Sequence, residues 1–194
     1  ASGELKTKPT QHSVKMLQEF GITADVLVCR TEHALNSELR RKLALFCNVE
    51  SIAVIEARDA KSIYEVPLLM EKEKLDQVVL QKLGLTTEKQ ADLTNWRDFV
   101  HRLYNPKTEV NIGLIGKYIE LKDSYKSIAE GFIHAGTAIE CCVNIQWIHS
   151  ESLTEENVKE KLSGLSGILV APGFGHRGIE GKIAAIRFAR ENKV

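Results

Sequence analysis

The sequence has no excess of either charge, no long apolar run and no recognisable targeting segment. Its 26 Lys and Arg residues balance 26 Asp and Glu residues, so the composition does not indicate a nucleic-acid partner or an anionic membrane surface. No segment approaches the roughly 20 apolar residues of a membrane span, and no signal peptide opens the sequence. We therefore expect a cytoplasmic protein that binds neither nucleic acid nor membrane.

Cysteine is scarce and irregularly spaced. None of the four cysteines forms a Cys-x-x-Cys pair, and each lies among apolar residues. This arrangement argues against a zinc site and against a disulfide framework. We expect buried core thiols rather than nucleophiles, in a reducing compartment, at Cys29, Cys47, Cys141 and Cys142.

What the sequence does contain is an alternation of short apolar strands and amphipathic helices. Its 194 residues, 43% of them hydrophobic and 27% charged, are enough for one large or two small globular domains. The alternation predicts the α/β class with parallel sheets. Strands are expected at residues 24–30, 51–57, 110–118, 142–150 and 167–173. Helices are expected at residues 12–21, 37–47, 60–71, 74–83, 92–104, 123–136, 153–164 and 179–192.

The domain organisation follows from a change in pattern near the middle of the chain. Residues 84–109 contain few strand signals and one amphipathic helix, which indicates a connecting segment. We predict two partial three-layer parallel-sheet domains, residues 1–83 and 110–194, joined by this helical linker. The start without Met and the end at an expected strand suggest a piece of a longer protein.

Several local signals predict where elements begin and end. Pro9 is expected to keep its segment extended ahead of the first helix. Ser37 is expected to cap a helix, and Gly136 to end one. Ser152 and Glu155 have the spacing of a capping box.

The segment LVAPGFGHRGIEGK (169–182) is the first candidate site. Gly173, Gly175 and Gly178 have the G-x-G-x-x-G spacing of a dinucleotide-binding loop between a strand and a helix. That motif belongs on the first strand of its unit, however, and here it follows the third. A P-loop is excluded by sequence, whereas a simple strand-to-helix turn and an oxyanion hole built on glycine N–H groups both remain open.

The segment GELKTKPTQHS (3–13) is the second candidate site. Two ammonium groups, two hydroxyls and a helix N-terminus lie close together in the sequence and predict a polyphosphate-binding cradle. Arg41 and Lys42, on a later helix, could add positive charge. A solvated basic loop is the alternative, and His12 is expected to be structural.

Five segments, taken in order, resemble the CTP synthase family across essentially the whole chain. They are KTKPTQHSV (6–14), LFCNV (45–49), SIYEVP (62–67), GLIGKYIELKDSYKSI (113–128) and PGFGHRGIEGK (172–182). The resemblance implies that residues 1–83 are the C-terminal part of the synthase (amidoligase) domain. It also implies that 84–109 are the linker and 110–194 the N-terminal part of a class I glutamine amidotransferase domain.

The family's activity is implied by the same resemblance. ATP and Mg²⁺ activate UTP as a phosphoryl intermediate, and ammonia displaces the phosphate to give CTP. The ammonia comes from L-glutamine hydrolysed at a Cys-His-Glu triad, and GTP promotes that hydrolysis. The family enzyme is a homotetramer that can polymerise into filaments.

Site residues also carry over from the family. The UTP/CTP site would comprise Lys6, Thr7, Lys8, Pro9, Thr10, Gln11 and Lys42. Ala60 would contact the ATP adenine, Gly173 would form the oxyanion hole and contact glutamine, and Phe174 would belong to a GTP-responsive surface. The chain departs from the family's usual P-G-G-F-G in having Ala171 and Pro172, although the donor glycine is kept.

The family's two chemical centres are not represented in the chain. The resemblance places the P-loop and the acidic Mg²⁺ ligands before residue 1, and the nucleophilic cysteine, histidine and glutamate after Val194. We therefore expect these residues alone to catalyse neither half-reaction, and none of the four cysteines to be the nucleophile. The alternatives are a non-catalytic pyrimidine-nucleotide-binding or assembly module and, more weakly, an NAD-dependent oxidoreductase.

Overall fold

The structure is a computed structural model of the chain, and it describes residues 5–87 and 89–194. The chain divides into two compact units, Ala1–Arg97 and Asp98–Val194. Each unit has its own small parallel sheet, of two strands in the first and three in the second. The predicted α/β class is confirmed. No helix among the described residues is long and apolar enough to cross a membrane.

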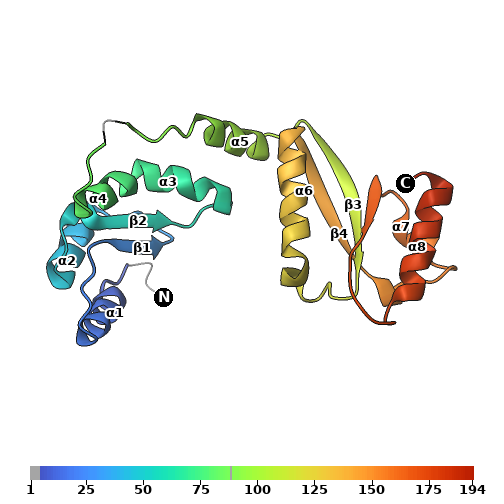
Figure 1. Cartoon of the computed structure of the whole chain (residues 1–194), viewed down its shortest axis with the longest axis horizontal. Helices are drawn as coiled ribbons and strands as arrows, with labels where there is room; N and C mark the ends of the chain where they lie inside the picture. The colour runs from blue at the N-terminus through green and yellow to red at the C-terminus, as the bar shows by residue number, and fades with distance from the viewer. Residues whose placement is uncertain (1–4, 88) are drawn as a thin grey trace. The chain divides into compact units, whose positions relative to one another are not determined.

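The first unit is built on two parallel strands, β1 and β2 (Figure 1), with Leu27 paired to Val54 and Thr31 to Arg58. Short 3-10 turns precede β2 and α3. The elements in order are α1 (Lys8–Glu19), β1 (Leu27–Thr31), α2 (Ser37–Cys47), η1 (Ser51–Ala53), β2 (Val54–Arg58), η2 (Ile63–Glu65), α3 (Val66–Lys72) and α4 (Leu75–Lys82).

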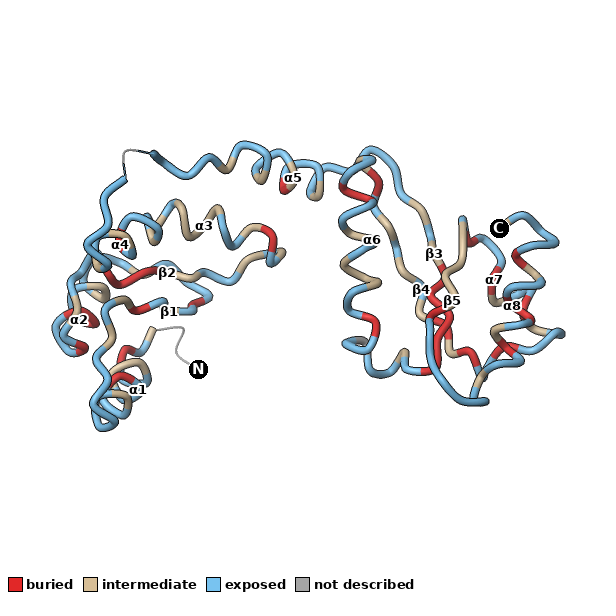
Figure 2. The backbone as a smooth tube through the Cα atoms, in the orientation of Figure 1, coloured by how far each residue is buried: buried red, intermediate tan, exposed pale blue. Residues whose placement is uncertain are grey.

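Helices cover both faces of this sheet. Val54 packs with Val14 of α1 and Leu43 of α2, whereas the next residue, Ile55, packs with Val78 of α4 on the other face. Successive strand residues point to opposite faces, so two adjacent apolar residues serve two cores. The unit therefore has three layers, and the buried part of β2 stands out in Figure 2.

The second unit has three parallel strands in the order β4-β3-β5. The chain leaves the central strand β3 for β4 on one side and later reaches β5 on the other. The elements in order are α5 (Thr94–Tyr104), which contains the division between the units, β3 (Thr108–Gly116), η3 (Lys122–Tyr125), α6 (Lys126–Ala138), β4 (Cys141–His149), η4 (Ser150–Ser152), α7 (Val158–Leu162), β5 (Gly167–Val170) and α8 (Ile179–Asn192).

The second sheet is also covered on both faces. Leu114 of β3 packs with Tyr125 and Ala171 on one face, and Ile115 packs with Leu162 and Ala185 on the other. Both strand residues are 0% exposed. This is the hydrophobic pattern of a strand buried on both sides.

The beginnings of α1 and α2 differ from the prediction. The first helix starts at Lys8, so Pro9 lies in its first turn instead of in an extended segment. Proline fits there because first-turn N–H groups have no intrahelical acceptor. In α2 the N-cap is Asn36, whose Oδ1 accepts from Leu39 N, and Ser37 is the first helical residue. The amide side chain of Asn36 takes the capping role predicted for the hydroxyl of Ser37.

Two helices of the second unit also differ from the prediction. The helix predicted at residues 153–164 is present only over α7, and the capping box is wrong because α7 begins after Glu155. Thr154 and Asn157 instead exchange side-chain hydrogen bonds, which hold a turn before the helix. Gly136 does not end α6, which runs on to Ala138. A Cβ at Gly136 would lie 2.4 Å from Cys141 O, so this glycine permits close packing on β4.

The prediction that the four cysteines are buried is correct for only some of them. Cys47 and Cys141 are buried and Cys29 is half-buried, but Cys142 is exposed. In the described sheet β4 is an edge strand, and the alternate residues Cys142, Asn144 and Gln146 in its first part are exposed. The local apolar context of Cys142 could not reveal which face of the strand it occupies.

Candidate functional site

The first candidate site is a cavity of about 720 Å³ at the carboxyl end of β1. Its wall combines the segment that leads into α1, the loop after β1 and the first turns of α2. The lining residues are Leu5, Lys6, Thr7, Lys8, His33, Ala34, Asn36, Glu38, Leu39 and Lys42. Three ammonium groups separated by as many as 36 positions in the sequence thus surround one cavity.

Local hydrogen bonds set the shape of the cavity near α1. Thr7 is 8% exposed and lies at the N-cap position of α1. Its Oγ1 accepts from Gln11 Nε2 at 3.1 Å, and its carbonyl accepts from Gln11 N at 3.1 Å. Gln11 therefore braces Thr7 and is absent from the cavity wall. Pro9 and Thr10 line a neighbouring cavity of about 460 Å³ instead.

The wall includes residues that sequence reasoning missed. His33 and Asn36 lie between β1 and α2, and Glu38 is in the first turn of α2. The signal that could have found them is positional, because ligands in parallel α/β sheets bind beyond the carboxyl ends of strands. The α2 N-terminus and the three lysines favour an anion in this cavity, with Glu38 as the one opposing charge among its described lining residues.

Arg40 anchors the α2 wall to the sheet. Its Nη1 donates to Val54 O at 2.8 Å and to Glu73 Oε2 at 2.7 Å, while Nη2 donates to Glu73 Oε1 at 3.0 Å. Glu56 N also donates to Glu73 Oε2, at 2.8 Å, and Glu56 Oε2 accepts from Leu35 N at 2.6 Å. One ion-pair network therefore fixes β2, α2 and the loop that lines the cavity.

The charges of this network influence each other's ionisation. The hydrogen bond to Glu73 raises the pKa of Arg40 above its ordinary value. Burial acts to raise the pKa of Glu73, but the hydrogen bonds from Arg40 and Glu56 N, together with the Arg40 charge, lower it overall. Both groups are therefore held in their charged forms.

A second cavity of about 470 Å³ lies at the carboxyl ends of β1 and β2 and includes Ala60. Val28, Ile63 and Met70 give it apolar walls, and Arg30 Nε donates to Asp59 Oδ1 at 2.8 Å at its rim. A flat, largely apolar ring such as a purine fits this lining chemically.

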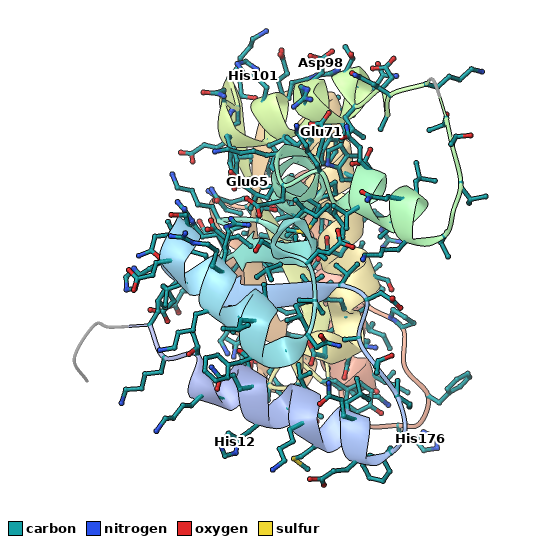
Figure 3. All side chains as sticks on the ribbon, turned by 90° about the vertical axis from the view of Figure 1, so that its left-hand side faces the viewer. His12, Glu65, Glu71, Asp98, His101 and His176 are labelled. Atoms are coloured by element: carbon teal, nitrogen blue, oxygen red, sulfur yellow. The ribbon has the colours of Figure 1, made fainter. Side chains whose placement is uncertain are left out.

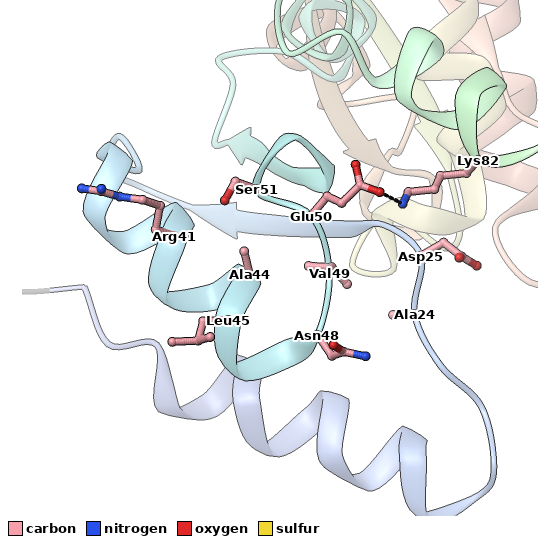
Figure 4. A pocket seen from close by; sticks show the side chains of 10 residues that line it. All are labelled: Ala24, Asp25, Arg41, Ala44, Leu45, Asn48, Val49, Glu50, Ser51 and Lys82. Carbon is pink, nitrogen blue, oxygen red and sulfur yellow. Dashed lines mark hydrogen bonds and ion pairs between the residues drawn. The ribbon is translucent and has the colours of Figure 1, made fainter.

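A third cavity, of about 680 Å³, was not predicted from the sequence (Figure 4). It lies beside the end of α2, and an ion pair of 2.7 Å between Lys82 and Glu50 crosses its wall. Arg41, which was considered as a charge for the phosphate cradle, lines this cavity and not the one that contains Lys42.

The glycine segment forms a loop between β5 and α8. Gly173, Gly175 and Gly178 have φ of 155°, 84° and 74°, a region that favours glycine. Residues 172–177 are exposed, and the Phe174 side chain is 97% exposed. The loop lies at the carboxyl edge of the sheet beside the end of β3, where the strand order reverses and ligands of α/β proteins bind.

The strand order also bears on the dinucleotide interpretation. In a dinucleotide-binding unit the glycine motif follows the first strand, which occupies the centre of the sheet. Here β3 is the first and central strand, and the glycine loop follows β5 instead. The oxyanion and simple-turn interpretations both fit this position.

The exposed histidines that Figure 3 labels line none of the cavities described above. His12 is exposed on α1, and His176 is exposed in the glycine loop (Figure 3). Burial raises the pKa of the Cys29 and Cys47 thiols, which disfavours the thiolate form needed for attack. Among the described residues, no group of three or more His, Cys, Asp or Glu side chains is placed to hold a metal ion.

Fold and cavities together define a class of protein, an α/β protein with a lysine-lined cavity in one unit and a glycine loop at the strand ends of the other. Residues 1–85 match the family model described as CTP synthase N-terminus, and residues 120–194 match the model described as glutamine amidotransferase class-I. The chain belongs to the CTP synthase family, covering its synthase region and the start of its amidotransferase domain. The resemblance carried by the sequence motifs is confirmed.

Individual relatives agree with this assignment. The chain is 61% identical to a CTP synthase of Cytophaga hutchinsonii and 63% identical to one of Flavobacterium johnsoniae, with alignments that cover 100% of this chain and 36% of each relative. It is 56% identical to a CTP synthase of Methanocaldococcus jannaschii, with 100% of this chain and 37% of that relative covered. The chain thus spans about 36% of the length of these two bacterial relatives.

Proposed function

We propose that the chain supplies the pyrimidine-nucleotide pocket and part of the glutamine site of a glutamine-hydrolysing CTP synthase. In this reaction ATP activates UTP, and ammonia released from glutamine converts it to CTP. The observation that carries the proposal is the cavity that Lys6, Thr7, Lys8 and Lys42 share. Family membership supports it independently, because the relatives are named CTP synthase.

The cavity suits a triphosphate on chemical grounds. Lysine ammonium groups act as point charges that bind phosphate oxygens, and the α2 N-terminus adds a partial positive charge. Thr7, which lines the cavity and is held by Gln11, offers a short polar side chain to the ligand. We assign Pro9, Thr10 and Gln11 to the support of this pocket, since none of them lines it.

The other family ligands are assigned more broadly. The cavity that contains Ala60 would hold the adenine of ATP between apolar side chains, and ATP supplies the phosphoryl group that activates UTP. No described residues are assigned to Mg²⁺. The exposed Phe174 is assigned to a GTP-responsive surface, and assembly as a homotetramer or filament belongs to the same proposal.

The glycine loop is assigned to glutamine hydrolysis. Gly173 is the first residue after Pro172 with a backbone N–H, and no side chain of its own shields that donor. A backbone N–H aimed at the developing oxyanion of an acyl group stabilises the transition state strongly, by about 2.7–4 kcal/mol for one donor. Ala171 and Pro172 precede this donor, so the departure from the usual family motif leaves it in place.

The pocket assignment is tested in the complete gene product that contains these residues. Lys42→Ala should raise the UTP concentration needed for half-maximal CTP formation by about tenfold, because one charge-assisted contact of about 1.5 kcal/mol or more is lost. The matched control is Lys15→Ala, an exposed lysine on α1 outside the cavity. Equal effects of the two substitutions would refute the assignment of Lys42, and absence of CTP formation by the unsubstituted protein would refute the function.

The isolated 194-residue chain provides a separate test. We expect it to form no CTP from UTP and ATP with either glutamine or ammonium chloride as nitrogen source. CTP formation by the purified chain would show that its own residues suffice for the chemistry. Retention of CTP without turnover would agree with the cavity assignment.

A further inference from the structure

Lys117 is a buried lysine at the carboxyl end of β3, next to the glycine loop. It is 4% exposed, and it is the only charged member of the buried polar set found among the described residues. A buried ammonium group is costly unless it is hydrogen-bonded. The structure shows no carboxylate within ion-pair distance of Lys117 in the described part of the chain, and Nζ instead donates to the backbone carbonyl of Phe174.

The side chain of Lys117 also fills the space beside Gly173. A Cβ on Gly173 would lie 2.8 Å from Lys117 Cε, and one on Gly175 would lie 4.0 Å from its Nζ. The lysine stem thus occupies the volume that the missing glycine side chain leaves open. Sequence reasoning singled out these glycines but gave no role to the lysine that packs against them.

The backbone of Lys117 is itself fixed on both sides. Its N–H donates to Tyr125 Oη at 3.1 Å, and its carbonyl accepts from Arg177 Nη2 at 3.2 Å. Tyr125 is 4% exposed and packs in the core with Leu114 of β3. Lys117 therefore connects a buried strand end to an exposed loop.

The loop needs such a connection. Gly173 and Gly175 both have positive φ, and glycine loses more conformational freedom on ordering than any other residue. Without an external contact, the peptides around Phe174 have several accessible orientations. A catalytic N–H must be held close to one orientation, because misplacement by about 1 Å can cost on the order of a hundredfold in rate.

We propose that Lys117 is a positioning residue for the amidotransferase reaction, and that it holds the glycine loop in the conformation that presents the Gly173 N–H to the oxyanion. The proposal rests on the function assigned above to the glycine loop. Lys117 acts through the Phe174 carbonyl and does not touch the reacting atoms. Its charge supplies a strong hydrogen bond where the loop offers only a neutral acceptor.

The test uses the complete gene product and compares Lys117→Met, Lys117→Arg and Lys161→Met. Methionine keeps the apolar stem but removes the donor, whereas arginine keeps a cationic donor. Lys161 is the matched control, because its Nζ donates to a backbone carbonyl, Ser152 O at 2.9 Å, in η4 of the same unit.

The first readout is the ratio of glutamine-dependent to ammonia-dependent CTP formation, in which losses of folded protein cancel. Lys117→Met should lower this ratio about 10- to 100-fold, through kcat and with little change in the KM for glutamine. Lys117→Arg should recover part of the ratio, and Lys161→Met should keep it. An unchanged ratio in Lys117→Met, or a loss confined to KM, would overturn the proposal.

The second readout is independent of activity. Trypsin cleaves after Arg177 when the loop opens, so Lys117→Met should accelerate cleavage at this bond about tenfold, as expected when a charge-assisted hydrogen bond is lost. Equal cleavage rates in Lys117→Met and Lys161→Met would show that Lys117 does not hold the loop. If the unsubstituted protein formed no CTP from either nitrogen source, the proposed function would fail, and the cleavage rates would still decide the role of Lys117.

Discussion

The ion pair between Arg40 and Glu73 allows a quantitative test of what stabilises the first unit. The two side chains are 25% and 19% exposed, and two hydrogen bonds join them, at 2.7 and 3.0 Å. Glu73 also accepts from Glu56 N at 2.8 Å. Glu73→Gln removes the negative charge. It also replaces one carboxylate oxygen with an amide NH₂ group, which cannot accept the hydrogen bond that this oxygen received from Arg40 or from Glu56 N.

The expected cost is about 2–3 kcal/mol, the value of charge-assisted hydrogen bonds. It should be lower than the 3–5 kcal/mol or so found when one partner of a fully buried pair is removed. Arg40 keeps three other contacts, its hydrogen bonds to Val54 O and, at 3.3 Å, to Leu35 O, and a 3.5 Å approach to Glu56 Oε2. These contacts leave its charge partly compensated.

Urea unfolding monitored by Trp96 fluorescence measures this cost. Trp96 reports on the first unit, because its Nε1 donates to Tyr64 O at 2.7 Å. Trp147→Phe in all variants removes the other of the two tryptophans. A loss of about 2 kcal/mol lowers the urea midpoint by about 1 M when the dependence of stability on urea is 1–3 kcal/mol/M.

The control is Glu71→Gln, which breaks a more exposed pair with Arg97. These side chains are 28% and 53% exposed, and the cost of a surface pair is at most about 1 kcal/mol. If both substitutions shifted the midpoint equally, burial and hydrogen-bond geometry would not be what makes the Arg40–Glu73 pair strong.

The same pair predicts a dependence on pH. The pKa of Glu73 is lowered in the folded state, so its contribution is complete above the unfolded-state pKa of about 4.3 and is lost as pH falls through the folded value. The midpoint difference between the parent and Glu73→Gln should therefore be constant from pH 6 to 8 and shrink on acidification below about pH 4.3. A difference that grew on acidification would contradict the sign of this shift.

Three further predictions use single substitutions. Gly181→Ala in α8 should destabilise the second unit by about 3 kcal/mol or more, because the new Cβ would lie 1.8 Å from Ser150 O. Gly131→Ala in α6 should instead stabilise this unit by about 0.5–1 kcal/mol, because its Cβ would meet no atom within 4 Å. Opposite shifts in melting temperature check this pair. Thr137→Val should be neutral or stabilising, because the buried Thr137 Oγ1 has no hydrogen-bond partner among the described residues, and a loss above about 1 kcal/mol would contradict this. The effect of Lys42→Ala on UTP should shrink at high salt, as measured by titration at two ionic strengths.

Sequence patterns predicted most accurately the helices that have a long amphipathic period. The helices predicted at 92–104 and 179–192 appear as α5 and α8 with nearly the same bounds, because their amphipathic periods are long. The start predicted for α7 was wrong because Thr154 and Asn157 each donate a backbone N–H to the side-chain oxygen of the other, ahead of the helix. Local competition between side-chain and helical hydrogen bonds decides such boundaries, and spacing alone does not reveal it.

The residues of the candidate sites could also be predicted only in part, because some of their contacts depend on the fold. Lys6 and Lys8 are only two positions apart, so the sequence itself brings them together, but whether they share a cavity with His33 and Asn36 depends on where β1 ends. The Arg40–Glu73 pair joins residues 33 positions apart and carries no local signal. The domain limits and ligand assignments derived from the family motifs stay predictions.

The position of Lys117 shows why its role is hidden from sequence and accessible in three dimensions. A lysine after an apolar strand ordinarily indicates the point at which the chain reaches solvent. Here Leu114 pairs in register with Leu169, and Ile115 with Val170, so the ends of β3 and β5 lie at the same sheet edge. The residue that follows β3 is thereby placed beneath the loop that follows β5, where it is buried. Glycine at position 173 is then required twice, once for its positive φ and once because a side chain would occupy the lysine's volume. A substitution at either position should therefore disturb the same loop.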